Sequence, residues 1–260
     1  MIITFLTDFG LRDDFVGTCH GVIARIAPGV RVIDVTHGVA PQAVVQGALV
    51  LRNTLPYMPV GVHLAVVDPG VGGDRRAIGV QTAEGRLFVG PDNGLLLLAA
   101  DDVVAAHELA NPRLRLPNVS RTFHARDVFA PAAAHLASGV PLAEFGNPIE
   151  PAHLVRLDLP EPEIAADRVT GTVLAIDRFG NVATNLRREH MLGAPGSRVE
   201  VELPLDRYYA TVAETFADAS AGELILYEDS YGMITLAISS GDAASLTGVM
   251  IGDVVQIARA

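Results

Sequence analysis

The stretch V-V-D-P-G-V-G-G-D-R-R, residues 66–76, decides how this chain is expected to fold. The apolar run that enters it, residues 64–67, has the length of a buried strand and stops at Asp68. A loop rich in glycine follows and leads to Arg75. Because open α/β sheets bind ligands at the carboxyl ends of their strands, we expect Asp68 at a binding edge, with Arg75 curled back toward it. The alternative is an ordinary Asp-Pro turn followed by a surface arginine.

The residues before this stretch alternate between strand-like and helix-like patterns. We expect strands at residues 2–6, 30–35 and 62–67, separated by helices at residues 15–26 and 43–55. This alternation is typical of a parallel sheet with crossover helices, a Rossmann-like α/β arrangement. The three strands end beside Asp8, His37 and Asp68. Since parallel strands end at one edge of a sheet, we expect these three polar side chains to converge there.

The residues after the stretch predict further elements. Residues 77–81 and 86–89 flank T-A-E-G, which is typical of a β-hairpin, and a leucine-rich helix is expected at residues 95–99. A third helix, residues 128–136, follows a polar cluster that contains His124. The expected structural residues are Asp14 as the cap of the first helix, Asp92 or Asn93 as the cap of the leucine-rich helix, and His135 on an alanine-rich face.

The pattern changes in the C-terminal part of the chain, where prolines accumulate between residues 147 and 162. We expect an α/β domain at residues 1–150, a Pro-rich linker at residues 151–165 and a second domain at residues 166–260. The second domain contains short β segments at residues 169–176, 181–186, 198–203, 223–227, 233–238 and 253–257. Regular spacing of short strands predicts a smaller antiparallel β-barrel.

Composition limits the classes of function. Among 260 residues, 50% are hydrophobic, which supports a sizeable core, and the net charge is −11. We therefore expect no nucleic-acid or anionic-membrane partner, because both require basic patches. The single cysteine, Cys19, excludes an internal disulfide, and the N-terminal residues lack the pattern of a signal peptide. No apolar run approaches the ~20 residues needed to span a bilayer, so a cytoplasmic location is expected.

The motifs taken together are more specific than any one of them. They are T-D-F-G, D-V-T-H, V-V-D-P-G-V-G, G-P-D-N-G, T-F-H-A-R-D-V-F-A-P-A-A-A-H-L, I-D-R-F-G-N-V-A-T-N and S-Y-G-M-I. In this order the chain resembles the adenosine-forming S-adenosyl-L-methionine (SAM) hydrolases, or SAM hydroxide adenosyltransferases, which are related to the fluorinase and the chlorinase. The resemblance covers nearly the whole chain. It implies an α/β domain followed by a β-barrel, and a homotrimer with the ligand at the subunit interface.

The resemblance also implies a catalytic trio. It maps onto Asp68, Arg75 and His124, all of which are present. The halogenases have a tyrosine at the position of Asp68 and a long inserted loop that this chain lacks, which favours water over halide as the nucleophile. The hypothesis is attack on C5′ of SAM by a water or hydroxide that these three side chains hold, with the proton acceptor left open between Asp68 and His124.

The resemblance implies substrate contacts from both domains. Asp8 is expected to bind the ribose hydroxyls, Asp177 the methionine ammonium and Ser230 the carboxylate. The remaining expected contacts are Asn181 and the backbone at Ala243 with adenine, and Asp13 and Tyr231 at the methionine end. The chain departs from the fluorinase where a tryptophan is replaced by Gln42 and an arginine by Tyr231, so the methionine end is the least constrained by the resemblance.

Three other functions are compatible with the same residues. A metallohydrolase would use an oxygen and nitrogen cluster at the sheet edge, drawn from Asp8, Asp13, His37, Asp68, His124 and Asp127. No close ligand pair of the H-E-x-x-H kind supports that cluster, so neither a metal nor another cofactor is expected. A SAM sensor without turnover and a SAM-dependent halogenase are the other two alternatives.

Overall fold

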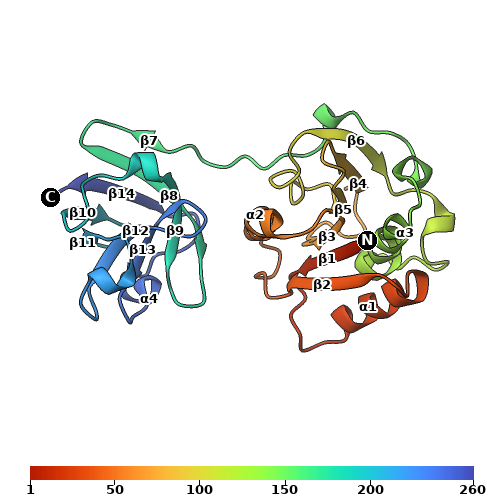
Figure 1. The fold of residues 1–260 in the computed structure, drawn as a ribbon, viewed down its shortest axis with the longest axis horizontal. Coiled ribbons are helices and arrows are strands. Elements are labelled where there is room, and N and C mark those ends of the chain that lie inside the picture. Colours follow the sequence, from red (N-terminus) through yellow and green to blue (C-terminus); the bar gives the residue numbers. More distant parts are fainter. The chain divides into compact units, whose positions relative to one another are not determined.

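A six-stranded sheet forms the centre of the first of two units, Met1–Leu157 and Asp158–Ala260, in a computed structural model that describes residues 1–260 (Figure 1). Its strands are β1 (Ile2–Thr7), β2 (Arg31–Thr36), β3 (Val62–Val66), β4 (Ala77–Thr82), β5 (Leu87–Pro91) and β6 (Val103–Glu108). The order is β2-β1-β3-β5-β4-β6. The pairs from β2 to β5 are parallel, whereas β4 is antiparallel to both β5 and β6. The predicted parallel part and the β4–β5 hairpin are confirmed, and the sheet as a whole is mixed.

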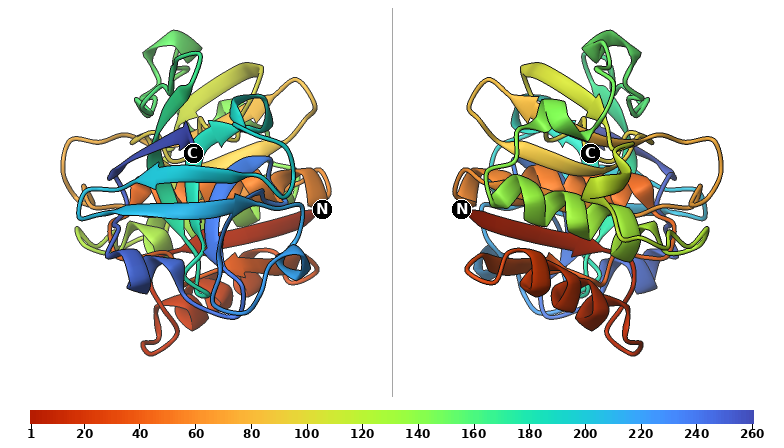
Figure 2. Two further views of the ribbon diagram at one scale, coloured as in Figure 1. Left: turned by 90° about the vertical axis from the view of Figure 1, so that its left-hand side faces the viewer. Right: turned by 90° about the vertical axis from the view of Figure 1, so that its right-hand side faces the viewer.

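Helices cover both faces of this sheet. They are α1 (Phe15–Ile26), α2 (Val44–Thr54) and α3 (Ala130–Ala137), which continues the π-helix η3 (Ala125–Phe129). Alternate residues of the central strands point to opposite faces. Ile3 and Phe5 of β1 pack with α1 and α3, whereas Leu6 packs with α2. Figure 2 shows α1 and α3 side by side, and Figure 1 shows α2 on the other face.

Two local predictions in this unit differ from the structure. No helix forms at residues 95–99, where the chain makes turns that bury Leu95 and Leu96 completely. Both leucines belong to the buried core cluster that also contains Leu6 and Leu51, so their packing decides the conformation of this segment. Asp14 occupies the position that precedes α1, but its carboxylate accepts a hydrogen bond from the Thr18 hydroxyl instead of capping the backbone.

The second unit is a closed β-barrel. Its strands are β7 (Glu163–Ile164), β8 (Arg168–Ile176), β9 (Val182–Arg187), β10 (Arg198–Glu202), β11 (Arg207–Val212), β12 (Leu224–Glu228), β13 (Met233–Ile238) and β14 (Val254–Arg259). Seven strands, in the order β14-β10-β11-β12-β13-β9-β8, close through the β14–β8 pair, and β7 lies outside on β8. The prediction of an all-antiparallel barrel is wrong at one pair, because β11 and β12 are parallel. The connection at residues 213–223 carries the chain back so that both strands run the same way.

Short helices complete the two units. The helix α4 (Ala243–Thr247) was not expected from the sequence pattern. The 3-10 turns are η1 (Leu55–Tyr57), η2 (Pro112–Leu114), η4 (Leu142–Phe145), η5 (Pro151–His153), η6 (Arg188–His190) and η7 (Phe216–Asp218). None of the helices is both long and apolar enough to cross a membrane.

Candidate functional site

A cavity of about 370 Å³ opens in the first unit where β1 and β3 end. Three of the polar residues expected from the sequence line it: Asp8, Asp68 and His124. Asp8 directly follows β1, and Asp68 lies two residues beyond β3. Because these two strands are parallel neighbours, their carboxyl ends meet, as the strand pattern predicted.

Asp68 and Arg75 form a close ion pair beside this cavity. Arg75 Nε lies 2.9 Å from Oδ1 of Asp68, and Nη2 lies 2.5 Å from Oδ2. Both side chains are largely buried, with 6% of Asp68 and 11% of Arg75 exposed. The Arg75 guanidinium also lies over the Phe129 ring, 5.2 Å from its centroid. Burial, the ion pair with Asp68 and the contact with the Phe129 ring hold this arginine in one orientation.

The loop between the two residues needs its glycines. A Cβ on Gly70 would lie 3.2 Å from Cγ of Arg75, in the space that the arginine occupies. Gly72 has φ +76°, and a Cβ there would lie 2.2 Å from the carbonyl oxygen of Arg121. Larger residues would therefore force the loop away from both its own arginine and the neighbouring segment.

His124 joins the pair from a third segment. It precedes η3, and its Nδ1 lies 2.8 Å from Nη2 of Arg75. An arginine donates hydrogen bonds and accepts none, so Nδ1 is the acceptor and the ring proton of neutral His124 is on Nε2. Burial and then the positive charge of Arg75 lower the pKa of His124 below its ordinary value. The neutral ring therefore presents an Nε2–H donor at neutral pH.

Asp8 is half-buried in the lining of the same cavity. Its Oδ2 accepts a hydrogen bond of 2.8 Å from the backbone N–H of Gln42, which also lines the cavity. Gln42 adopts φ +66°, a conformation that is unusual for a residue with a side chain. The strained backbone thus aims its N–H at the Asp8 carboxylate and fixes that side chain.

Aromatic rings form an apolar part of the lining that sequence reasoning missed. Phe123 lies 6.1 Å from Phe9 and 5.2 Å from Phe15, and both contacts are edge-on. All three rings line the cavity. Phe9 and Phe123 stand inside motifs already quoted for their polar residues, and an aromatic residue next to such a loop was the available signal.

Three other expected polar residues, His37, Asp13 and Asp127, do not line the cavity. The prediction that His37 converges with Asp8 and Asp68 is wrong: its ring is buried and its Nδ1 lies 2.8 Å from the Thr7 hydroxyl. The β1–β2 register shifts between Phe5 and Leu6 and pairs Leu6 with Thr36, so His37 lies opposite Thr7.

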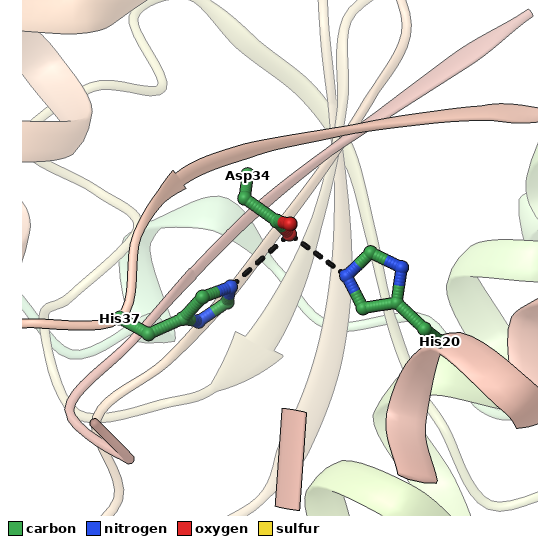
Figure 3. Close-up of side chains that lie close together, drawn as sticks. All are labelled: His20, Asp34 and His37. Carbon is green, nitrogen blue, oxygen red and sulfur yellow. Dashed lines mark hydrogen bonds and ion pairs between the residues drawn. The ribbon is translucent and has the colours of Figure 1, made fainter. Parts of the chain in front are cut away.

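The six-residue cluster of a metallohydrolase is likewise not assembled. Asp13 is exposed and outside the cavity lining. Asp127 is buried, paired with Arg126 at 2.6 Å, and accepts a hydrogen bond from the Ser120 backbone. Of that expected set, only His37 belongs to a group that could hold a metal ion, and its companions there are His20 and Asp34 (Figure 3).

The barrel unit contains its own cavity, of about 560 Å³, which both Asp177 and Asn181 line. Asp177 accepts hydrogen bonds from the Asn181 backbone at 3.0 Å and from its side-chain amide at 2.7 Å. Phe216 and Tyr227 line the same cavity with ring centroids 5.0 Å apart, and sequence reasoning missed both. Burial, reinforced by Asp229 and Asp177, raises the pKa of Tyr227 to about 12, which keeps its hydroxyl protonated.

The other barrel residues expected at a binding site lie on different loops. Ser230 and Tyr231 are exposed between β12 and β13 and are not in the cavity lining. Ala243 is fully buried at the start of α4, two residues after Gly241, which does line the cavity. Of the five barrel residues expected from the resemblance, the structure therefore places two in this cavity.

Comparisons with known proteins identify the same family for both units of the chain. Residues 3–146 match the model of the SAM hydroxide adenosyltransferase N-terminal domain, and residues 171–256 match that of the C-terminal domain. The chain is 49% identical over 261 residues to an (R)-S-adenosyl-L-methionine hydrolase of Salinispora tropica, covering 98% of this chain and 97% of the relative. It is 40% identical over 269 residues to an (R)-S-adenosyl-L-methionine hydrolase of Thermus thermophilus, covering 98% of each.

More distant relatives and a solved structure extend this picture. The chain is 30% identical over 291 residues to a fluorinase of an Actinoplanes species, covering 100% of this chain and 98% of the fluorinase. The crystal structure of an uncharacterized conserved protein from Thermotoga maritima superposes with a TM-score of 0.92 and 38% identity, covering 99% of this chain and 100% of that one.

Proposed function

Because the chain belongs to the SAM hydroxide adenosyltransferase family, we propose that it hydrolyses SAM to adenosine and L-methionine. The observation that carries the proposal is the joined set of Asp68, Arg75 and His124 beside one cavity of the first unit. A protein that only bound SAM would need neither a buried carboxylate nor a histidine aligned by the same arginine.

The reaction is a displacement at carbon C5′ of SAM. The oxygen of a water or hydroxide forms a bond to C5′, and the electron pair of the C5′–S bond goes to sulfur. Methionine leaves as a neutral thioether, so the leaving group needs no general acid. The proton of an attacking water has to go to a base or to solvent, and positioning of the oxygen in line with the breaking bond supplies much of the rate.

The hydrogen bonds suggest how the three side chains share this work. Arg75 donates to both Asp68 and His124, so the Nδ1 lone pair of His124 is already used. In this arrangement His124 offers Nε2–H to the oxygen of the nucleophile and orients it. We therefore assign the role of proton acceptor to Asp68, the one anionic member of the set.

The substrate-binding residues are proposed from the resemblance and from their positions in each unit. Asp8 would accept hydrogen bonds from the two ribose hydroxyls, a common solution for ribose. In the barrel unit, Asp177 would bind the methionine ammonium, and Asn181 would contact adenine. Further contacts, at Asp13, Ser230, Tyr231 and the backbone of Ala243, are proposed from the resemblance alone. A homotrimer is also expected from the resemblance, and analytical ultracentrifugation would measure it.

The proposal is tested by incubating the protein with SAM and separating the products by chromatography. We expect adenosine and methionine in equal amounts, with activity that survives EDTA. Absence of adenosine would contradict the proposal. Formation of 5′-chloro-5′-deoxyadenosine in the presence of chloride would instead support a halogenase, the function of the more distant relatives named fluorinase.

A further inference from the structure

A second group of polar side chains lies outside the cavity, where α1 meets the edge strand β2. It consists of His20 on α1, Asp34 on β2 and His37 just after β2 (Figure 3). The Oδ1 atom of Asp34 lies 2.9 Å from Nε2 of His20 and 3.1 Å from Nε2 of His37. The two imidazole rings thus point at one carboxylate oxygen from two sides. None of the three residues lines the cavity described above.

The buried nitrogen of His37 is the most informative atom of this group. The His37 side chain is 4% exposed, and its Nε2 is buried without a hydrogen-bond partner, since the approach to Asp34 lacks hydrogen-bond geometry. Buried polar atoms are nearly always satisfied. The unsatisfied nitrogen of His37 points at the Asp34 carboxylate and toward the His20 ring. A cation bound between these three side chains would satisfy it.

The surroundings orient His37 for this role. Its Nδ1 lies 2.8 Å from the hydroxyl of Thr7, which is fully buried. When Nδ1–H donates to that hydroxyl, the lone pair of Nε2 is directed into the group, as in the outer shell of many metal-bound histidines. The Phe5 ring packs against both imidazoles, with centroids 4.8 Å from His37 and 5.8 Å from His20, and restricts their movement.

We propose that His20, Asp34 and His37 bind a divalent transition-metal ion of the zinc class. Their three ligand atoms lie within 4.8 Å of one another. Ligands of a tetrahedral zinc ion with bonds of ~2.0–2.1 Å are separated by about 3.3 Å, so small side-chain rotations suffice. Two imidazoles and a carboxylate suit zinc, cobalt or nickel, whereas magnesium and calcium prefer oxygen ligands.

The group is reached by solvent, because the His20 side chain is 34% exposed and the Asp34 side chain is 45% exposed. A metal ion could enter from solvent, and water could occupy its fourth coordination position. The ion would join the surface of α1 to the edge strand of the sheet. Its expected effect is stabilisation of this part of the first unit, independent of SAM hydrolysis.

The test is metal binding by the full, chelator-treated chain. Titration with Zn²⁺ is expected to show one ion per chain and a higher melting temperature, and Co²⁺ is expected to give visible absorption bands of tetrahedral coordination. His20→Ala and Asp34→Asn each change a partly exposed side chain, so the fold should be retained. Each is expected to weaken Zn²⁺ binding at least tenfold, whereas Mg²⁺ should not compete.

The matched control is His153→Ala, which removes an exposed histidine away from this group. It is expected to leave the affinity for Zn²⁺ and the absorption of bound Co²⁺ unchanged. Absence of stoichiometric Zn²⁺ binding, or equal affinity in His20→Ala, Asp34→Asn and the parent chain, would overturn the proposal. Either result would identify the group as hydrogen-bonded side chains only and would leave the proposed SAM hydrolysis untouched.

Discussion

The two cavities differ in how their polar residues are held. In the first unit, Asp68, Arg75 and His124 come from segments up to 56 residues apart and bond to one another across the fold. In the barrel, Asp177 and Asn181 bond to each other within a single hairpin tip. The first arrangement exists only when the whole unit is folded, whereas the second is local.

This difference separates two kinds of task. The Asp68–Arg75 pair is nearly buried, so its charges act in a low-dielectric environment and their geometry is fixed before substrate arrives. Asp177 is exposed at the surface of the barrel, where solvent weakens its interaction with any ligand. We therefore expect substitutions in the first cavity to change the rate of the chemical step, and those in the second to change substrate affinity.

The largest effect is expected for Asp68→Asn. The amide keeps the shape of the side chain but removes the proposed proton acceptor, so kcat for SAM hydrolysis should fall by about 10²–10⁴-fold with little change in KM. Steady-state kinetics with chromatographic detection of adenosine measures both constants.

The matched control is Asp92→Asn, because the Asp92 carboxylate is also buried and ion-paired, with Arg76 at 2.5 Å. Asp92 additionally accepts a hydrogen bond from the Val155 backbone and does not line the cavity. This variant should lower thermal stability while the folded enzyme keeps its kcat. Equal losses of kcat in both variants would show that the Asp68 effect is structural.

A smaller effect is expected for Asp8→Ala, which removes the proposed ribose contact. KM for SAM should rise about tenfold or more, the equivalent of ~1.4 kcal/mol, while kcat changes less. Initial rates over a range of SAM concentrations separate the two constants. An unchanged KM would remove Asp8 from the binding site.

The exposed barrel residue should contribute less than the half-buried Asp8. Asp177→Asn keeps an acceptor for the hairpin backbone but removes the charge proposed to bind the ammonium group, and KM should rise about fivefold, or ~1 kcal/mol. Asp206→Asn is the control, since Asp206 is an exposed aspartate at another turn of the barrel. A loss of kcat at constant KM in Asp177→Asn would contradict the division of tasks between the cavities.

The smallest effect is expected from pH. The pKa of His124 is lowered by burial and by Arg75, so the ring stays mainly neutral as pH falls to 6.5. Between pH 8 and pH 6.5, kcat should therefore decrease by less than about twofold. Below the lowered pKa, protonation of His124 places a hydrogen on Nδ1. Arg75 then loses its acceptor on this ring, and kcat is expected to fall for that reason. If kcat instead falls with a midpoint at or above pH 6.5, and this fall is absent in His124→Ala, the pKa of His124 is not lowered.

The sequence was most informative where local pattern and tertiary structure agree. The predicted helix at residues 15–26 coincides with α1, and the strand predicted at residues 62–67 differs from β3 by one residue. Asp68 followed from that strand end. Arg75 beside Asp68 followed from the glycine-rich loop that joins them. His124 became a partner of these two residues only through the resemblance, because no local pattern places a residue 56 positions from Asp68 beside it.

Side-chain direction was beyond what the pattern specified. The strand ends suggested that His37 would join Asp8, but a one-residue register shift between β1 and β2 turns it toward Thr7. The same shift brings His37 beside Asp34, and the helix places His20 there. Such a group depends on the rotation of a helix against an edge strand, which periodicity does not determine.

The source of the new oxygen in the product tests the central claim most directly. The protein is incubated with SAM in water enriched in ¹⁸O, and the adenosine and methionine formed are analysed by mass spectrometry. Attack of water on C5′ predicts one ¹⁸O atom in adenosine, at the 5′-hydroxyl, and none in methionine, with product formation strongly reduced in Asp68→Asn. Adenosine without the label, or labelled adenosine formed equally fast by Asp68→Asn, would contradict the account.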